Sequence, residues 1–169
     1  MSDDNPPVYD QTFFLDLARP KPGETDEQVR ERWNAWRRDP ANAGRRVTFE
    51  GVDFRTEENR GISFEGFKFG DGAGFEGATF GNWARFEGAT FGIWARFEGA
   101  TFGDEARFEG ATFGNRALFE GATFGDRAGF EGAAFGDGAG FEGATFGILA
   151  GFAGATFGDG ASFGGRSDD

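Results

Sequence analysis

An eleven-residue phrase, FEGATFG followed by four variable residues, recurs through most of this chain of 169 residues. From Phe64 to Phe163 the repeating phenylalanines are separated alternately by five and six positions, without interruption. A short unit repeated at fixed spacing cannot bury its apolar face alone, so each copy must pack on its neighbours. The repeat therefore predicts a solenoid.

The order of small, polar and aromatic residues within the unit favours strands over helices. In a helix the two phenylalanines of a unit would lie about 140° apart, at ~100° per residue, and would share no face. Glycine, which recurs in every unit, costs roughly 1 kcal/mol at each interior helix position. In a strand, Ala78 and Phe80 lie on one face and Thr79 on the other. We therefore predict an all-β solenoid of very short strands and glycine-containing turns, with Ala and Phe inside.

The unit A-x-F-x-x resembles the pentapeptide-repeat family, and the resemblance covers Phe49 to Phe163. It implies a right-handed quadrilateral β-helix. Every second unit here has six residues, as in ATFGNW before ARFEG, and the additional residue is expected to bulge at a corner. We expect about five coils, which at ~4.8 Å per coil would form a rod about 25 Å long.

The segment before the repeats contains WNAWRRDP, which resembles the leader WNxWRxxNP of many bacterial family members. We expect a capping helix at about 26–38, because Thr25 and Gln28 have the spacing of a capping box. Its apolar stripe consists of Val29, Trp33 and Trp36. We expect the stripe to lie over the first coil and cover its open edges; a partner-binding helix is the alternative.

The chain is expected to have three parts: an N-terminal segment at 1–46, the β-helix at 47–164 and a disordered tail at 165–169. The apolar cluster Phe13–Leu17 predicts a second short helix beside the cap. Between Phe54 and Phe64 the segment RTEENRG contains an insertion, which predicts a surface loop at 55–61. A functional projection is the alternative interpretation of this loop.

Glutamates recur immediately after inward phenylalanines and should form two rows on opposite sides of the solenoid. Outward arginines lie two positions before some of them, and we expect surface ion pairs that relieve repulsion. Leucine or glycine replaces arginine further on. The glutamates expected to be uncompensated there form the candidate acidic interaction face: Glu120, Glu131 and Glu142. A metal or acid–base site is the alternative interpretation.

Large apolar residues occupy corner positions where polar residues usually occur. They are Trp83, Ile93, Trp94, Ile148 and Leu149. Exposed apolar side chains at corners predict a contact patch, unless they fold back on the N-terminal segment. The last coil is followed only by GGRSDD, and an uncovered solenoid end favours end-to-end homo-oligomers through that coil.

Charge and composition exclude several classes of function. Of the 29 acidic residues, most lie in the repeats, which argues against nucleic-acid binding because that needs the opposite sign. The chain has no Cys and no His, and no nucleophile–base pair or phosphate-binding glycine motif is present. We expect no enzyme activity, cofactor or metal. The polar N-terminus and the absence of long apolar runs predict a cytoplasmic protein without membrane contact.

These features predict a non-enzymatic structural or protein-interaction module that presents rigid acidic faces to an unknown protein partner. The alternative comes from the resemblance. Some pentapeptide-repeat proteins protect or inhibit DNA gyrase by presenting a rod with the width and charge of DNA. The acidic repeats are compatible with such a DNA-mimic modulator of gyrase or topoisomerase.

Overall fold

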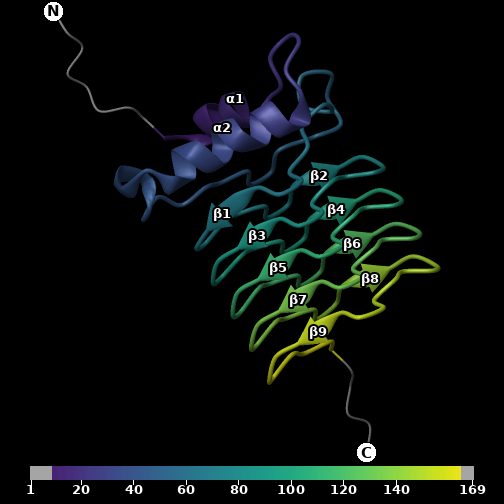
Figure 1. Cartoon of the computed structure of the whole chain (residues 1–169). Helices are drawn as coiled ribbons and strands as arrows, with labels where there is room; N and C mark the ends of the chain where they lie inside the picture. The colour runs from purple at the N-terminus through teal and green to yellow at the C-terminus, as the bar shows by residue number, and fades with distance from the viewer. Residues whose placement is uncertain (1–8, 165–169) are drawn as a thin grey trace, which may run out of the picture.

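The computed structural model describes residues 9–164, so the disordered tail predicted at 165–169 lies outside the described residues. The described chain forms a β-solenoid with two helices packed across its N-terminal end (Figure 1). Helix α1 spans Gln11–Ala18 and helix α2 spans Asp26–Arg38. A short 3₁₀ helix, η1, follows at Pro40–Asn42. Helix α2 is the predicted capping helix.

The solenoid is built from parallel strands of two or three residues. They are β1 Lys68–Gly70, β2 Thr79–Phe80, β3 Thr90–Phe91, β4 Thr101–Phe102, β5 Thr112–Phe113, β6 Thr123–Phe124, β7 Ala134–Phe135, β8 Thr145–Phe146 and β9 Thr156–Phe157. Odd-numbered strands form one five-stranded sheet and even-numbered strands a four-stranded sheet. The numbers of strands stacked in the two sheets agree closely with the prediction of about five coils.

The other two sides of each coil are held by single β-bridges rather than by strands. One row of bridges joins Thr48, Gly74, Arg96, Leu118, Gly140 and Ser162, and the other joins Arg85, Arg107, Gly129 and Gly151. Two sheets and two bridge rows give the coil four sides. The quadrilateral β-helix expected from the repeat is therefore present.

The core consists of stacked phenylalanines and alanines. Phe75 lies on Phe97 with ring centroids 4.9 Å apart and parallel planes, and Phe86 lies on Phe108 in the same way at 4.8 Å. Rings from adjacent sides meet edge to face, an arrangement that aromatic quadrupoles favour and that adds to the free energy of burying each ring. The strands thus follow the predicted alternation, with an outward Thr before the inward Phe except at β1, which has Lys68, and β7, which has Ala134.

The additional residue of each six-residue unit is accommodated at a corner in the left-handed conformation. Non-glycine residues take this conformation at intervals of one repeat: Trp83, Trp94, Glu105, Arg116, Arg127 and Leu149. Their φ angles lie between 56° and 60°, in a region that is unfavourable for residues with a Cβ atom. The neighbouring coils, which pack above and below each corner, hold these residues there.

Helix α2 covers the open edge of the first coil, as predicted. Trp33 is fully buried, stacks on Phe67 with centroids 4.9 Å apart, and donates its indole N–H to the Lys68 carbonyl at 2.9 Å. The Asn34 side chain accepts from the Lys68 N–H and donates to the Gly66 carbonyl. Val29 is buried and Trp36 is partly buried among the aromatic residues of α1. The helix therefore supplies partners for backbone groups that a preceding coil would otherwise pair.

Candidate functional site

The glutamates form two stacked rows on the two bridge sides of the solenoid. Backbone hydrogen bonds join the glutamate turns of successive coils, as in Gly77 N–H to Glu98 O and Gly99 N–H to Glu120 O, both 2.9 Å. One row contains Glu76, Glu98, Glu120 and Glu142, and the other contains Glu65, Glu87, Glu109 and Glu131. This is the arrangement that the spacing predicts.

Arginines pair with the glutamates of the preceding coil. Arg96 lies 3.6 Å from the Glu76 carboxylate, and Arg107 lies 3.6 Å from that of Glu87. Arg85 makes the equivalent pair with Glu65. Ion pairs were expected from arginines close to the glutamates in sequence. The structure instead places each arginine beside the glutamate twenty positions earlier, because its side chain extends across the coil boundary.

This offset changes which carboxylates lack a cation. The residues that would pair with the next four glutamates are Leu118, Gly129, Gly140 and Gly151. Within residues 9–164, five glutamates of the two rows therefore make no ion pair: Glu98, Glu109, Glu120, Glu131 and Glu142. The predicted face began at Glu120 and ended at Glu142, so the set without ion pairs begins one coil earlier than expected. Glu142 differs from the other four because it accepts a hydrogen bond from the Ser162 hydroxyl.

Three of these carboxylates, at Glu98, Glu109 and Glu120, are partly buried against the solenoid. One oxygen, Oε2, is buried without a hydrogen-bond partner among the described residues at Glu98, Glu109 and Glu120. Carboxylates of successive coils meet over glycine: a Cβ atom at Gly129 would lie 2.6 Å from Glu109 Oε1 and 2.9 Å from Glu131 Oε2. The glutamates thus occupy the space that arginine side chains fill in earlier coils.

Burial and mutual repulsion raise the pKa of these carboxyl groups. Desolvation is the larger cause at Glu98, Glu109 and Glu120, and neighbouring glutamates of the same row add to it. At Glu142 the hydrogen bond from Ser162 lowers the pKa instead. The middle of each row is therefore where a cation supplied by a partner would relieve the most unfavourable charge.

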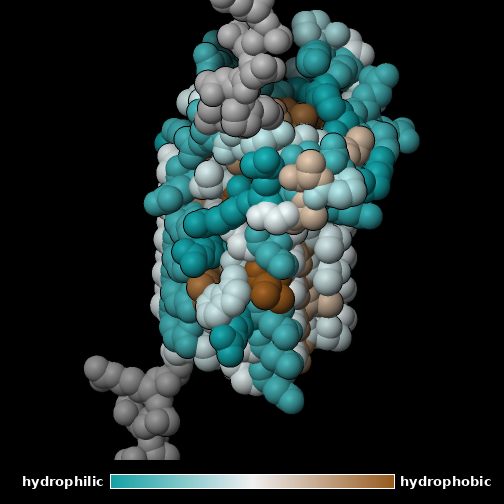
Figure 2. Space-filling view, turned by 90° about the vertical axis from the view of Figure 1, so that its left-hand side faces the viewer, coloured by the Kyte–Doolittle hydropathy of each residue, from teal (hydrophilic) through white to brown (hydrophobic). Residues whose placement is uncertain are grey.

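The apolar corner residues are exposed but do not form one patch. Trp83 is 59% exposed and Leu149 is 75% exposed; they lie on the same edge, three coils apart, with Ile148 beside Leu149. Ile93 and Trp94 lie half a coil away, on the opposite edge. In Figure 2 the visible face is mainly hydrophilic with small hydrophobic areas. The structure therefore does not bring the five predicted residues together.

Polar and cationic residues separate the apolar side chains along each edge. The Trp83 indole N–H donates to Glu105 at 3.1 Å, and Glu105 also pairs with Arg127 at 2.7 Å. On the other edge the Arg116 guanidinium lies 5.0 Å from the centre of the Trp94 ring. These contacts order the edges as mixed columns, a pattern that becomes visible only when residues 22 positions apart are aligned.

Residues 9–164 contain no cluster of three or more acidic side chains arranged to hold a metal ion. Neither described helix has the length and apolar character needed to cross a bilayer.

The stacked short parallel strands, four-sided coils and ladders of Phe define a parallel β-helix protein. A family model of pentapeptide repeats, described as nine copies, matches residues 94–134 and 119–165. Over residues 94–165 the chain is therefore similar to the pentapeptide-repeat family, with the Phe-centred repeats that its sequence predicted. A search of curated proteins and a search of solved structures each found no match. The family supports a structural or protein-interaction module, on a fold that is generally non-catalytic.

Proposed function

We propose that the two glutamate rows bind a cationic protein segment, so that the chain acts as a non-enzymatic interaction module. The observation that carries this proposal is the run of carboxylates without an ion pair at Glu98, Glu109, Glu120 and Glu131, of which the first three are partly buried. Arginines already occupy the equivalent places in the first coils. A lysine or arginine from a partner would complete the same ion pairs further along the rows.

The rigidity of the solenoid supports this function. Each carboxylate is held by a backbone that bonds to the coils on both sides, so the rows keep a fixed repeat of ~4.8 Å. An extended basic segment has side chains of the same face every two residues, at ~6.6–6.8 Å. This spacing matches neither adjacent row members at ~4.8 Å nor alternate members at ~9.6 Å. The long side chains of the segment would therefore have to lean along the row to reach successive carboxylates, so the fixed spacing selects for geometry as well as charge.

The test is calorimetric titration with a short oligoarginine peptide at low salt. A triple variant, Glu109→Gln, Glu120→Gln and Glu131→Gln, removes three charges from the rows. The matched control, Asp104→Asn, Asp126→Asn and Asp137→Asn, removes three charges from the corners. It keeps the side-chain oxygen that accepts from the next coil, as Asn82 and Asn115 already do. We expect the first variant to weaken binding more than the second; equal weakening would show that only net charge is recognised.

A second candidate function, DNA mimicry, is supported by charge density in the middle coils. Residues 119–140 contain Glu120, Asp126, Glu131 and Asp137 against Arg127. At ~4.8 Å per coil, this is one net negative charge per ~1.6 Å of axis, close to ~1.7 Å in double-stranded DNA. A DNA gyrase supercoiling assay tests it: inhibition or protection that the glutamate triple variant loses would support mimicry, and no effect at micromolar protein would exclude it.

A further inference from the structure

The hydrogen-bond ladder between coils loses three backbone donors together beside the inserted loop 55–61. At the equivalent corner of the next coil, three N–H groups donate to the coil before it: Gly103 to Phe80 O at 3.1 Å, Asp104 to Asn82 Oδ1 at 2.9 Å and Arg107 to Ala84 O at 2.8 Å. One coil earlier, the N–H groups of Gly81, Asn82 and Arg85 have no acceptor within residues 9–164. Asn82 is exposed and Gly81 and Arg85 are partly buried, so these donors are open to a ligand.

The insertion explains the interruption. A Cβ atom at Gly103 would lie 2.7 Å from Asn82 N and 2.8 Å from Gly81 C, because the coils are in close contact there. At Gly81 the nearest atom would be Cγ of the Arg55 side chain, at 3.6 Å. The loop therefore separates the first two coils at this corner. Because equivalent N–H groups point toward the preceding coil, the three unpaired donors point into the separation.

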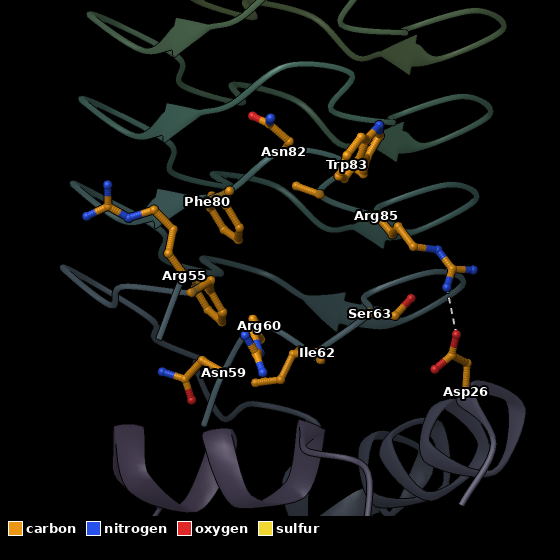
Figure 3. A pocket seen from close by; sticks show the side chains of 14 residues that line it. Asp26, Arg55, Asn59, Arg60, Ile62, Ser63, Phe80, Asn82, Trp83 and Arg85 are labelled. Carbon is orange, nitrogen blue, oxygen red and sulfur yellow. Dashed lines mark hydrogen bonds and ion pairs between the residues drawn. The ribbon is translucent and has the colours of Figure 1, made fainter. Parts of the chain in front are cut away.

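A pocket of about 360 Å³ occupies this separation. One wall is the inserted loop with Phe54 and Ile62, and the other is the segment from Phe80 to Arg85. Figure 3 shows the side chains of Asn82 and Trp83 pointing away from the inserted loop, where they contact the next coil. The backbone of the 80–85 segment is thus the surface that faces the pocket.

Arginines bring positive charge to the pocket, on a chain with a formal net charge of −12. Arg55 is paired with Asp53, and Arg85 is paired with Asp26 and Glu65. Arg60 lines the pocket and makes neither an ion pair nor a side-chain hydrogen bond to any described residue. Arg60 lies four residues before Phe64, as Asn82 and Asp104 lie four residues before Phe86 and Phe108; at those later positions a side-chain oxygen accepts the N–H from the following coil.

We propose that this pocket is a binding site for a phosphate group. Three backbone N–H groups along one wall and the Arg60 guanidinium are donors of the kind that phosphate oxygens accept from. On the facing wall, the carbonyl groups of Phe54 and Ile62 also lack a backbone donor within the described chain, and a protonated phosphate oxygen can donate to such a carbonyl. The pocket volume lies within the range of small-ligand sites, so it accommodates inorganic phosphate or the phosphate group of a small ester.

The experiment is a titration of the ¹⁵N-labelled full chain with inorganic phosphate, followed by amide chemical shifts at constant ionic strength. We expect saturable shifts for Gly81, Asn82 and Arg85, and none for their equivalents Gly103 and Asp104. Glycerol 3-phosphate in a second series distinguishes a phosphate ester from free phosphate as the better ligand. Sulfate in a third series, which lacks the proton that the carbonyl groups would accept, should bind more weakly.

Two variants of Arg60 and one matched control complete the test. Arg60→Gln should weaken phosphate binding about tenfold or more, because a charge-assisted contact is lost. Arg116→Gln, on the opposite edge, should have no effect. Arg60→Asp should abolish binding and raise the melting temperature, because the introduced carboxylate would accept the Asn82 N–H in place of the ligand.

Two results would overturn the proposal. One is the absence of shifts at Gly81, Asn82 and Arg85 up to about 20 mM phosphate, an excess for a millimolar site. The other is equal weakening by Arg60→Gln and Arg116→Gln, which would mean an adventitious ion only, bound by arginines in general.

Discussion

Replacing Gly129 by arginine would extend the row of ion pairs by one coil. Gly129 is bridged to Arg107 and has an ordinary backbone conformation, so the new side chain would lie toward Glu109 as Arg107 lies toward Glu87 at 3.6 Å. The new Cβ atom would meet Glu109 Oε1 at 2.6 Å. That oxygen is the end of a flexible side chain and can move toward the guanidinium.

Two contributions set the size of the effect. Replacing a glycine in a compatible conformation restricts the unfolded chain and stabilises by about 0.4–1 kcal/mol. A partly exposed ion pair adds about 0.2–1 kcal/mol. Together they raise the free energy of unfolding by roughly 0.6–2 kcal/mol, which corresponds to about 2–6 °C in melting temperature for a chain of this size.

Thermal unfolding of Gly129→Arg should be compared with two controls. Gly129→Ala restricts the unfolded chain in the same way but adds no ion pair. The melting temperature of Gly129→Arg should therefore be higher than that of Gly129→Ala at low salt, and this difference should shrink in about 1 M salt. Gly132→Arg places the same side chain in open space at φ +66° and should destabilise by about 1–2 kcal/mol through backbone strain. If Gly129→Arg is no more stable than Gly129→Ala at low salt, the pairing across coils assigned to these rows is incorrect.

Three further predictions concern pH, a corner ladder and self-association. The raised pKa values of Glu98, Glu109 and Glu120 mean that the native state holds these protons more tightly than the unfolded chain. Their contribution to stability is therefore present below the ordinary value of 4.5 and is lost as pH rises through the raised values; changing all three to Gln should reduce that loss in melting curves recorded across this range. Acids with lowered pKa values stabilise the native state at higher pH and lose that contribution as pH falls; one is Asp53, whose pKa is lowered to about 2 by Arg55. Ile93→Asn should supply the missing side-chain acceptor for the Asn115 N–H, as Asp71 does for the Ile93 N–H at 3.0 Å. The new hydrogen bond should add about 0.5–1.5 kcal/mol to the free energy of unfolding. End-to-end association through the last coil remains a prediction: Phe163 is 54% exposed, and a charge at Ala161 should reduce the molar mass measured by light scattering, whereas a strictly monomeric wild type would exclude it.

The repeat alone predicts most of the fold, because it determines residue spacing around and along the solenoid. Four unequal sides follow from alternating five- and six-residue units, and the cap follows from the tryptophan stripe of α2. The choice of left-handed corner residues does not follow, since Trp83 and Leu149 are not types that favour positive φ. Contacts with the coils above and below determine that conformation, and a local sequence window does not contain them.

The glutamate rows were predictable, but their ion pairs were not. The sequence places Arg107 two residues before Glu109, whereas the structure places its guanidinium beside Glu87. The direction in which an outward side chain crosses the coil boundary decides between these partners, and residue spacing is compatible with both. The pocket illustrates a similar limit. The insertion at 55–61 is visible in the sequence, but the loss of three hydrogen bonds at Gly81, Asn82 and Arg85 depends on the path that the loop takes.

The coils differ chemically from one another only where the sequence departs from the repeat. In a perfect stack every N–H group meets a carbonyl and every carboxylate has the same neighbour, so no coil differs from the next. The insertion leaves three neighbouring donors unpaired at the second coil, and the loss of arginine after Arg107 leaves carboxylates without an ion pair in later coils. The chain therefore carries sites of opposite electrostatic character on one rigid scaffold. Because the coils between them bond to one another in register, substitutions at the acidic rows should leave phosphate binding unchanged, and this independence makes the two proposals separable.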